Sequence, residues 1–257
     1  MTGGPARVRR LDRGVLRVAA GVAVLGVLLG RFGAAPFVDG VRAAGPVPIV
    51  VAVLVTAGTT WCCALRWSLV SRRRGEPLAL PVAYGAYYRS QLINATLPGG
   101  VVGDLHRGVV HGWRPVLWER AVGQAVQLPL VGALLLPGAW RWTGLAVVAA
   151  LVAAGGAVAR LSLLSSAGHL LVFVVAAASA GAALPMPSLV PVAALVLLGS
   201  AIPLNVAGWG PREGVAAWAF ATFGSTAEVG LAVAVTFGVI ATVATLPGLA
   251  FLRRRGA

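Results

Sequence analysis

Charged residues are scarce in this sequence. They make up 11% of the 257 residues, and only 7 are acidic, whereas soluble domains carry about 25% charged residues. Lysine is absent, so all 21 basic residues are arginine and arginine as such points to no site. Hydrophobic residues make up 58%, and the mean hydropathy is +0.88. This composition excludes an ordinary soluble domain and predicts an all-α protein with several membrane spans.

Groups for metal, disulfide or covalent chemistry are also few. Cys62 and Cys63 are adjacent inside an apolar run, and the three histidines, His106, His111 and His169, are scattered. No CxxC, P-loop, nucleophile elbow, HExxH or paired acidic motif is present. We therefore expect no metal, no cofactor, no catalytic residue and no enzymatic activity.

The arginine clusters border apolar segments. The formal net charge is +14, but short clusters in these positions follow the positive-inside rule and do not indicate nucleic-acid binding. They predict a multi-pass protein of the bacterial inner membrane with both termini in the cytoplasm. Full spans are predicted over residues 14–30, 48–67, 121–137, 143–159, 161–184 and 229–252. A basic flank and an apolar run also fit a signal peptide at residues 14–30, but Arg31 follows directly and no clean cleavage site is present.

Two further apolar segments, residues 81–110 and 190–224, each have flanks that prefer one side of the membrane. Both are therefore predicted as re-entrant hairpins, entering from opposite faces. The single membrane domain, residues 1–257, then divides into inverted repeats over residues 14–137 and 143–252, each with three spans and one hairpin. The alternative is eight transmembrane helices kinked at proline and glycine.

The first hairpin breaks at Pro98-Gly99-Gly100, because proline and glycine interrupt a helix. Irregular backbone at membrane depth is tolerated only inside protein or beside a wet cavity. Asp104 and Arg107 follow three residues apart, so both can lie on one helix face and pair. The pair is either the polar floor of a headgroup cavity or an ion pair that anchors the hairpin at the interface.

The glycines of this break leave backbone N–H groups open at the start of the return arm. Amides at a helix N-terminus attract anions such as phosphate, so Gly99, Gly100 and Gly103 are candidates for phosphate binding. The alternative is close helix packing through small residues. Asn94 precedes the break and can either line it or satisfy freed carbonyl groups.

A second break lies about one hundred residues later, in the sequence AIPLNVAGWGPREG. Gly208 and Gly210 precede Pro211, which suits the first turn of a helix. Open amides near Gly210, like those near Gly100, are expected to hold a phosphate. Arg212 and Glu213 then lie in that turn, about 100° apart around the axis, so they need not pair with each other. Two interrupted segments at corresponding positions are typical of a transporter site between inverted repeats.

Arg212 has two possible roles at this break. It can hold a phosphate, or it can pair with Asp104 or Glu119 across the repeat interface. For Glu119 itself, we expect the ordinary role of an acid near a helix start, which complements the helix dipole.

The segments YYRSQLINATLPGGVVGDLHR, VLWERAVGQ, IPLNVAGWGPREGVAAWAF and TLPG resemble the lysylphosphatidylglycerol synthase transmembrane-region family, also called flippase-like domain proteins. The resemblance covers residues 84–252. It implies a lipid flippase module, which in full-length synthases precedes a cytosolic aminoacyl-tRNA-dependent transferase. Since the chain stops at Ala257, we expect a stand-alone member without synthase activity.

The leading functional hypothesis is translocation of a membrane phospholipid or lipid-linked headgroup. The alternatives are a non-transporting partner of a separate envelope-lipid enzyme, or an enzyme that uses Asp104 or Glu213 as a base. The predicted substrate-binding residues are Asn94, Pro98, Gly99, Gly100, Asp104, Arg107, Gly208, Gly210, Arg212 and Glu213.

Overall fold

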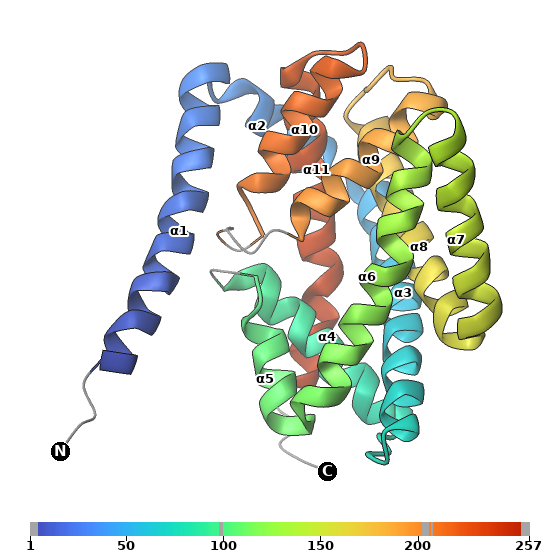
Figure 1. The fold of residues 1–257 in the computed structure, drawn as a ribbon. Helices are drawn as coiled ribbons and strands as arrows, with labels where there is room; N and C mark the ends of the chain where they lie inside the picture. The colour runs from blue at the N-terminus through green and yellow to red at the C-terminus, as the bar shows by residue number, and fades with distance from the viewer. Residues whose placement is uncertain (1–4, 98–99, 202–205, 207, 253–257) are drawn as a thin grey trace.

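The computed structural model describes residues 5–97, 100–201, 206 and 208–252 (Figure 1). Within these ranges the chain is all-helical and contains no β-strand, which confirms the predicted fold class at that level. The eleven α-helices of the described part and one 3-10 helix are α1 (Pro5–Phe32), α2 (Ala35–Ala43), α3 (Pro46–Arg73), α4 (Leu80–Thr96), α5 (Val102–His111), α6 (Trp113–Leu135), α7 (Ala139–Gly155), α8 (Ala157–Ser179), α9 (Met186–Ser200), α10 (Pro211–Thr222), α11 (Ala227–Thr245) and η1 (Leu246–Phe251).

Three helices in the described ranges have the length and hydropathy needed to cross a bilayer: α3, α8, and α11 continued by η1. A fourth candidate is the pair formed by α1 from Ala19 onward and α2, whose axes are bent by 104°. α7 has only 17 residues, and α6 carries Arg114, Glu119 and Arg120 in its first half. The apolar helices indicate a membrane-embedded protein, and the layout of six full spans stays a prediction.

Two segments expected between spans are largely helical. Residues 31–47 contain α2, which has Pro36 in its first turn, where proline is favoured. Residues 111–120 lie mostly in α6, which already begins at Trp113. This polar segment lies between the predicted hairpin and the predicted span 121–137, where a loop is expected. It instead forms the start of α6, with Glu119 buried inside the protein.

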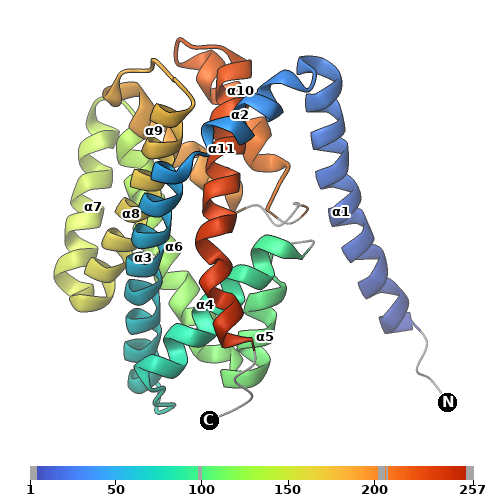
Figure 2. The same ribbon diagram turned by 180° about the vertical axis from the view of Figure 1, so that it is seen from behind.

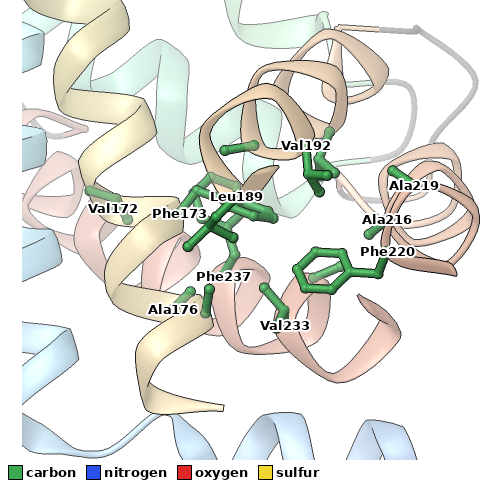
Figure 3. Packing of buried hydrophobic residues seen from close by; sticks show 14 of the residues in the cluster. Val172, Phe173, Ala176, Leu189, Val192, Ala216, Ala219, Phe220, Val233 and Phe237 are labelled. Atoms are coloured by element: carbon green, nitrogen blue, oxygen red, sulfur yellow. The ribbon is translucent and has the colours of Figure 1, made fainter. Parts of the chain in front are cut away.

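The apolar core surrounds α11, which packs against α2, α3, α4, α8 and α10. Figure 3 shows side chains of α8, α9, α10 and α11 meeting there, among them Phe173, Val192, Phe220 and Phe237. Small residues allow the close helix contacts: a Cβ on Gly230 of α11 would overlap the α10 backbone. Such packing is the main source of helix association in lipid, where the hydrophobic effect between helices is weak.

Two helical hairpins occupy opposite ends of the bundle. Figures 1 and 2 show α4 and α5 at the end where α1 begins and α11 ends, and α9 and α10 at the other end. The ends of α4, α5, α9 and α10 that flank the two breaks lie toward the middle of the bundle. Glycine is required at both breaks, because Gly100 has a φ of 59° and Gly210 a φ of 122°, which L side chains avoid.

The tight contact between α4 and α5 gives a testable prediction. A Cβ on Gly103 would overlap the Ser90 backbone, so Gly103→Ala is expected to lower the free energy of unfolding by about 1–3 kcal/mol. The control is Gly58→Ala on α3, where the new Cβ would meet nothing within 4 Å. That variant is expected to be neutral or slightly stabilising. Unfolding in mixed micelles by titration with sodium dodecyl sulfate measures both, and equal stabilities would contradict the prediction.

Candidate functional site

Five charged side chains from α3, α5 and α6 form one chain of ion pairs with alternating sign. Arg66 Nε donates to Glu119 Oε1 at 3.0 Å, and Glu119 Oε2 lies 3.5 Å from Arg107 Nη2. Arg107 Nη2 in turn donates to Asp104 Oδ1 at 2.7 Å. Arg120 completes the chain by pairing with the other oxygen of Asp104. The chain contains three guanidinium groups and two carboxylates, so it carries one positive charge.

Glu119 is the centre of this chain. Its side chain is 0% exposed, and a charge so deep in a protein is stable only when it is paired and hydrogen-bonded. Tyr87 Oη on α4 donates to Glu119 Oε1 at 3.2 Å. Arg66 Nη1 donates to Ser162 Oγ on α8 at 2.9 Å. One carboxylate therefore holds α3, α4, α5 and α6 together, and α8 joins through Arg66.

Asn94 connects the two arms of the first hairpin. Its Nδ2 donates to Asp104 Oδ2 at 2.8 Å, and its Oδ1 accepts from the backbone N–H of Gly103 at 2.7 Å. Ser90 Oγ adds a longer bond of 3.3 Å to Asp104 Oδ1. Asn94 and Ser90 thus fix the position of the Asp104 carboxylate, which accepts from both Arg107 and Arg120.

Arg107 lies between two aromatic rings. Its guanidinium carbon is 4.0 Å from the ring centroid of Tyr87 and 4.7 Å from that of Trp67. Within the described part of the chain, Nε and Nη1 of this buried side chain have no hydrogen-bond partner. Cation–π contacts, each worth about 2 kcal/mol when desolvated, take the place of those bonds.

Arg212 and Glu213 form a second, separate ion pair at the start of α10. Arg212 Nε donates to Glu213 Oε1 at 2.9 Å, and the backbone N–H of Gly210 donates to Glu213 Oε2 at 2.6 Å. The Arg212 guanidinium lies over the rings of Trp209 and Phe237. The glycine at position 238 leaves room for it, since a Cβ there would overlap the guanidinium.

A cavity of about 390 Å³ lies between the two ion-pair clusters. Helices α3, α4, α6, α8, α9, α10 and α11 all contribute to its wall. Its charged lining consists of Arg66, Arg120 and Arg212 with one carboxylate, Glu119. Asp104 and Glu213, outside the lining, pair with two of these arginines, so the two clusters together carry one excess positive charge. This excess favours an anion, and arginine binds phosphate and carboxylate through paired N–H groups.

A second cavity of about 320 Å³ adjoins the first. Both volumes fall in the range of ordinary ligand pockets. Four residues, His169, Ser200, Gly208 and Phe237, line both cavities. The remaining polar lining of the second cavity is uncharged and includes Thr59, Gln91 and Asn94. The two cavities are therefore neighbours with a common wall; arginine lines the first, and the described lining of the second is uncharged.

The predicted site residues are placed as follows. Asp104 and Arg107 pair as their spacing indicates. Asn94 and Gly100 line the second cavity, and Gly208 and Arg212 line the first. Glu213 pairs with Arg212, and the backbone N–H of Gly210 donates to Glu213. Pro98 and Gly99 lie outside the described residues, as do residues 202–205 and 207.

One prediction about this site is wrong, and one of the two roles considered for Arg212 is not found among the described residues. The amides of Gly103 and Gly210 are not open to an anion, because the side chains of Asn94 and Glu213 accept from them. Among the described residues Arg212 pairs with Glu213, its neighbour, and not with Asp104 or Glu119. The side chain of Glu213 curls back to its own helix end, which brings both groups to one side of the turn.

Sequence reasoning missed Arg66, Glu119 and Arg120 as parts of the site. A signal was present for Arg66, since it lies inside the predicted span 48–67 and a charge in a span marks a functional or paired residue. Glu119 was assigned to a helix start, yet α6 begins six residues earlier. Arg66 and Glu119 pair although they are 53 residues apart in the sequence, so no local sequence pattern predicts the pair.

The described residues contain no group of three His, Cys, Asp or Glu side chains that could hold a metal ion. Comparison with known proteins found no matching family model, no matching curated protein and no matching solved structure. The function is therefore argued from the geometry of the site.

The cationic character of the first cavity can be tested with its own cysteine. Cys63 lines this cavity, and its Sγ lies 3.8 Å from Arg66 Nη2. In Cys62→Ala protein, we expect Cys63 to react about tenfold faster with an anionic than with a cationic methanethiosulfonate, after each rate is normalised to that of a free thiol. Tenfold corresponds to about 1.4 kcal/mol of electrostatic preference. Cys62, which is outside the cavity lining, serves as control in Cys63→Ala protein; a cationic preference at Cys63 would contradict the prediction.

Proposed function

We propose that this chain translocates lipids across the bacterial inner membrane, and that its cationic cavity receives the phosphate of the lipid headgroup. The observation that carries the proposal is the cavity of about 390 Å³ lined by three arginines and one carboxylate inside an apolar helical bundle. Charges inside a membrane are costly and mark ion or substrate pathways. A phosphate is the group that this lining can bind best.

The proposed topology has six full spans and two re-entrant hairpins, arranged as inverted repeats over residues 14–137 and 143–252. Support comes from the helix pairs α4–α5 and α9–α10, which lie at opposite ends of the bundle with the helix ends that flank the breaks toward its middle (Figure 2). Support also comes from the arginine clusters at residues 72–74 and 253–255. By the positive-inside rule, these clusters and both termini lie in the cytoplasm.

Arg120 is the proposed entry group. Its side chain is 49% exposed, whereas Arg66 and Arg212 are buried. An incoming phosphate replaces the Asp104 carboxylate on Arg120 and is then shared with the deeper guanidinium groups. Each transfer exchanges one contact of a guanidinium group for another. A carboxylate that the phosphate replaces keeps its other hydrogen bonds: Asp104 with Arg107 and Asn94, Glu119 with Tyr87, and Glu213 with the Gly210 amide. The sequence has no P-loop, so the proposed movement is either energy-independent or coupled to an ion.

Lipid movement in proteoliposomes tests this proposal. Fluorescent phospholipids are placed in both leaflets, and an impermeant reductant bleaches the outer one. The proposal predicts bleaching well beyond half of the signal in vesicles with protein and about half in protein-free vesicles. Bleaching that stops at half for anionic and zwitterionic lipids alike would overturn the proposal and favour the alternative of a non-transporting partner for an envelope-lipid enzyme.

A further inference from the structure

The described lining of the second cavity contains hydrogen-bonding groups but no charged side chain. Its described lining has no Asp, Glu or Arg, and its polar side chains are hydroxyl groups, amides and one imidazole. The undescribed segments 98–99, 202–205 and 207 contain no Asp or Glu in the sequence either. An ammonium group placed here would therefore have no anionic partner.

Two side chains of this cavity offer hydrogen-bonding atoms to a ligand. Gln91 Oε1 accepts from Thr60 Oγ1 at 3.0 Å, and the described residues give its NH₂ group no partner. His169 Nδ1 lies 2.6 Å from the Ser165 carbonyl oxygen. A carbonyl oxygen only accepts, so Nδ1 carries the proton, and Nε2 of the neutral ring is then an acceptor. A donor and an imidazole beside hydroxyl oxygens suit a ligand that both donates and accepts, as an alcohol does.

The position of this cavity relates it to the phosphate site. It shares Ser200, Gly208 and Phe237 with the cationic cavity. With the phosphate at the arginines of the cationic cavity, as proposed above, a group attached to it extends past these shared residues toward the second cavity. The second cavity thus faces the part of the headgroup beyond the phosphate.

We infer that the transported lipid is an anionic phospholipid whose headgroup beyond the phosphate is uncharged and rich in hydroxyl groups, such as glycerol or a sugar. This inference rests on the proposed function. A hydroxyl group buried in the second cavity finds hydrogen-bond partners, which offset its desolvation. An ammonium group would lie there unpaired, near three guanidinium groups, and burial of an unpaired charge is costly. Headgroups that carry ethanolamine, choline or an esterified amino acid are therefore disfavoured.

Headgroup competition in proteoliposomes tests the inference. Acyl-labelled phosphatidylglycerol, phosphatidylinositol and phosphatidylethanolamine are compared in otherwise identical vesicles. We expect the two hydroxyl-bearing lipids to move at least about tenfold faster than phosphatidylethanolamine; the faster of the two separates a sugar-like from a glycerol headgroup. Equal rates for all three would overturn the inference and leave the proposed function intact, whereas no movement of any lipid would overturn the proposed function.

A substitution that adds the missing carboxylate sharpens the test. Gln91→Glu keeps the shape of the side chain and the acceptor for Thr60, and it places a negative charge in the second cavity. We expect this variant to move phosphatidylethanolamine faster and phosphatidylglycerol more slowly than wild-type protein. Gln91→Leu removes the hydrogen-bonding group without adding charge, so it is expected to slow the hydroxyl-bearing lipids and to leave phosphatidylethanolamine unimproved. An unchanged headgroup order in Gln91→Glu would contradict the inference.

Binding can be measured without transport. In detergent, short-chain dihexanoyl phosphatidylglycerol is expected to protect Cys63 from alkylation at concentrations about tenfold lower than the ethanolamine analogue. Protection by both at the same concentration would contradict the headgroup preference even in a protein that moves no lipid.

Discussion

Replacing Glu119 with Gln is expected to lower the free energy of unfolding by about 3–5 kcal/mol, which is the usual loss when one partner of a buried ion pair is removed. The carboxylate is completely buried, and it accepts from Arg66 and Tyr87 while lying beside Arg107. The neutral amide keeps the size of the side chain but leaves Arg66 without an anion. Unfolding in mixed micelles measures the loss.

Glu228→Gln provides the matched control, because Glu228 is exposed in the first turn of α11. Its loss is expected to stay within about 0.5 kcal/mol. In the double variant Arg66→Leu/Glu119→Leu both charges are gone. The free energy of unfolding that it loses is therefore expected to be smaller than the sum of the losses in Arg66→Leu and Glu119→Leu. If Glu119→Gln were as stable as Glu228→Gln, the result would contradict the role of Glu119 as the centre of the ion-pair chain.

Replacing Arg212 with Ala is expected to reduce lipid movement to the rate of protein-free vesicles. Arg212 is the one arginine that the α9–α10 hairpin contributes to the lining of the cationic cavity. Without it, a phosphate that has entered through the first hairpin finds no cation on the other side. The measurement is the rate of bleaching beyond the outer leaflet.

Arg212→Ala also leaves Glu213 buried without its cation, so loss of folding must be separated from loss of transport. In Arg212→Gln/Glu213→Gln both charges are absent and no charge is left buried without a partner, and we expect a folded protein that still fails to move lipid. Arg160→Ala, at an exposed position of α8, is expected to keep the wild-type rate. Wild-type transport in the double variant would show that Arg212 binds no substrate.

The sequence indicates the two breaks because proline and glycine have fixed backbone consequences. Gly100 and Gly210 adopt the positive φ values that such breaks require. The spacing of Asp104 and Arg107 likewise predicts their pairing, since residues three apart share one helix face. These are local properties, and each was readable from fewer than ten residues.

No local sequence pattern indicates the contacts between distant segments. Arg66 and Glu119 meet only because α3 and α6 cross, and the bend between α1 and α2 depends on where α2 packs against α11. The open amides failed as a prediction for another reason. The sequence places Asn94 and Glu213 near the two breaks. Whether their side chains turn toward the backbone or toward a ligand depends on the surrounding helices, which the sequence does not show.

The most direct test of the account is to block the cavity without changing any charge. Ser200 lies at the end of α9 on the wall shared by both cavities, and its Oγ donates to the carbonyl group four residues earlier. Ser179 ends α8 with the same kind of hydrogen bond but is exposed. Bleaching assays should therefore compare Ser200→Trp and Ser179→Trp with wild-type protein. The account predicts that Ser200→Trp stops lipid movement and that Ser179→Trp keeps it; wild-type movement in a folded Ser200→Trp protein would contradict passage of the headgroup through this cavity.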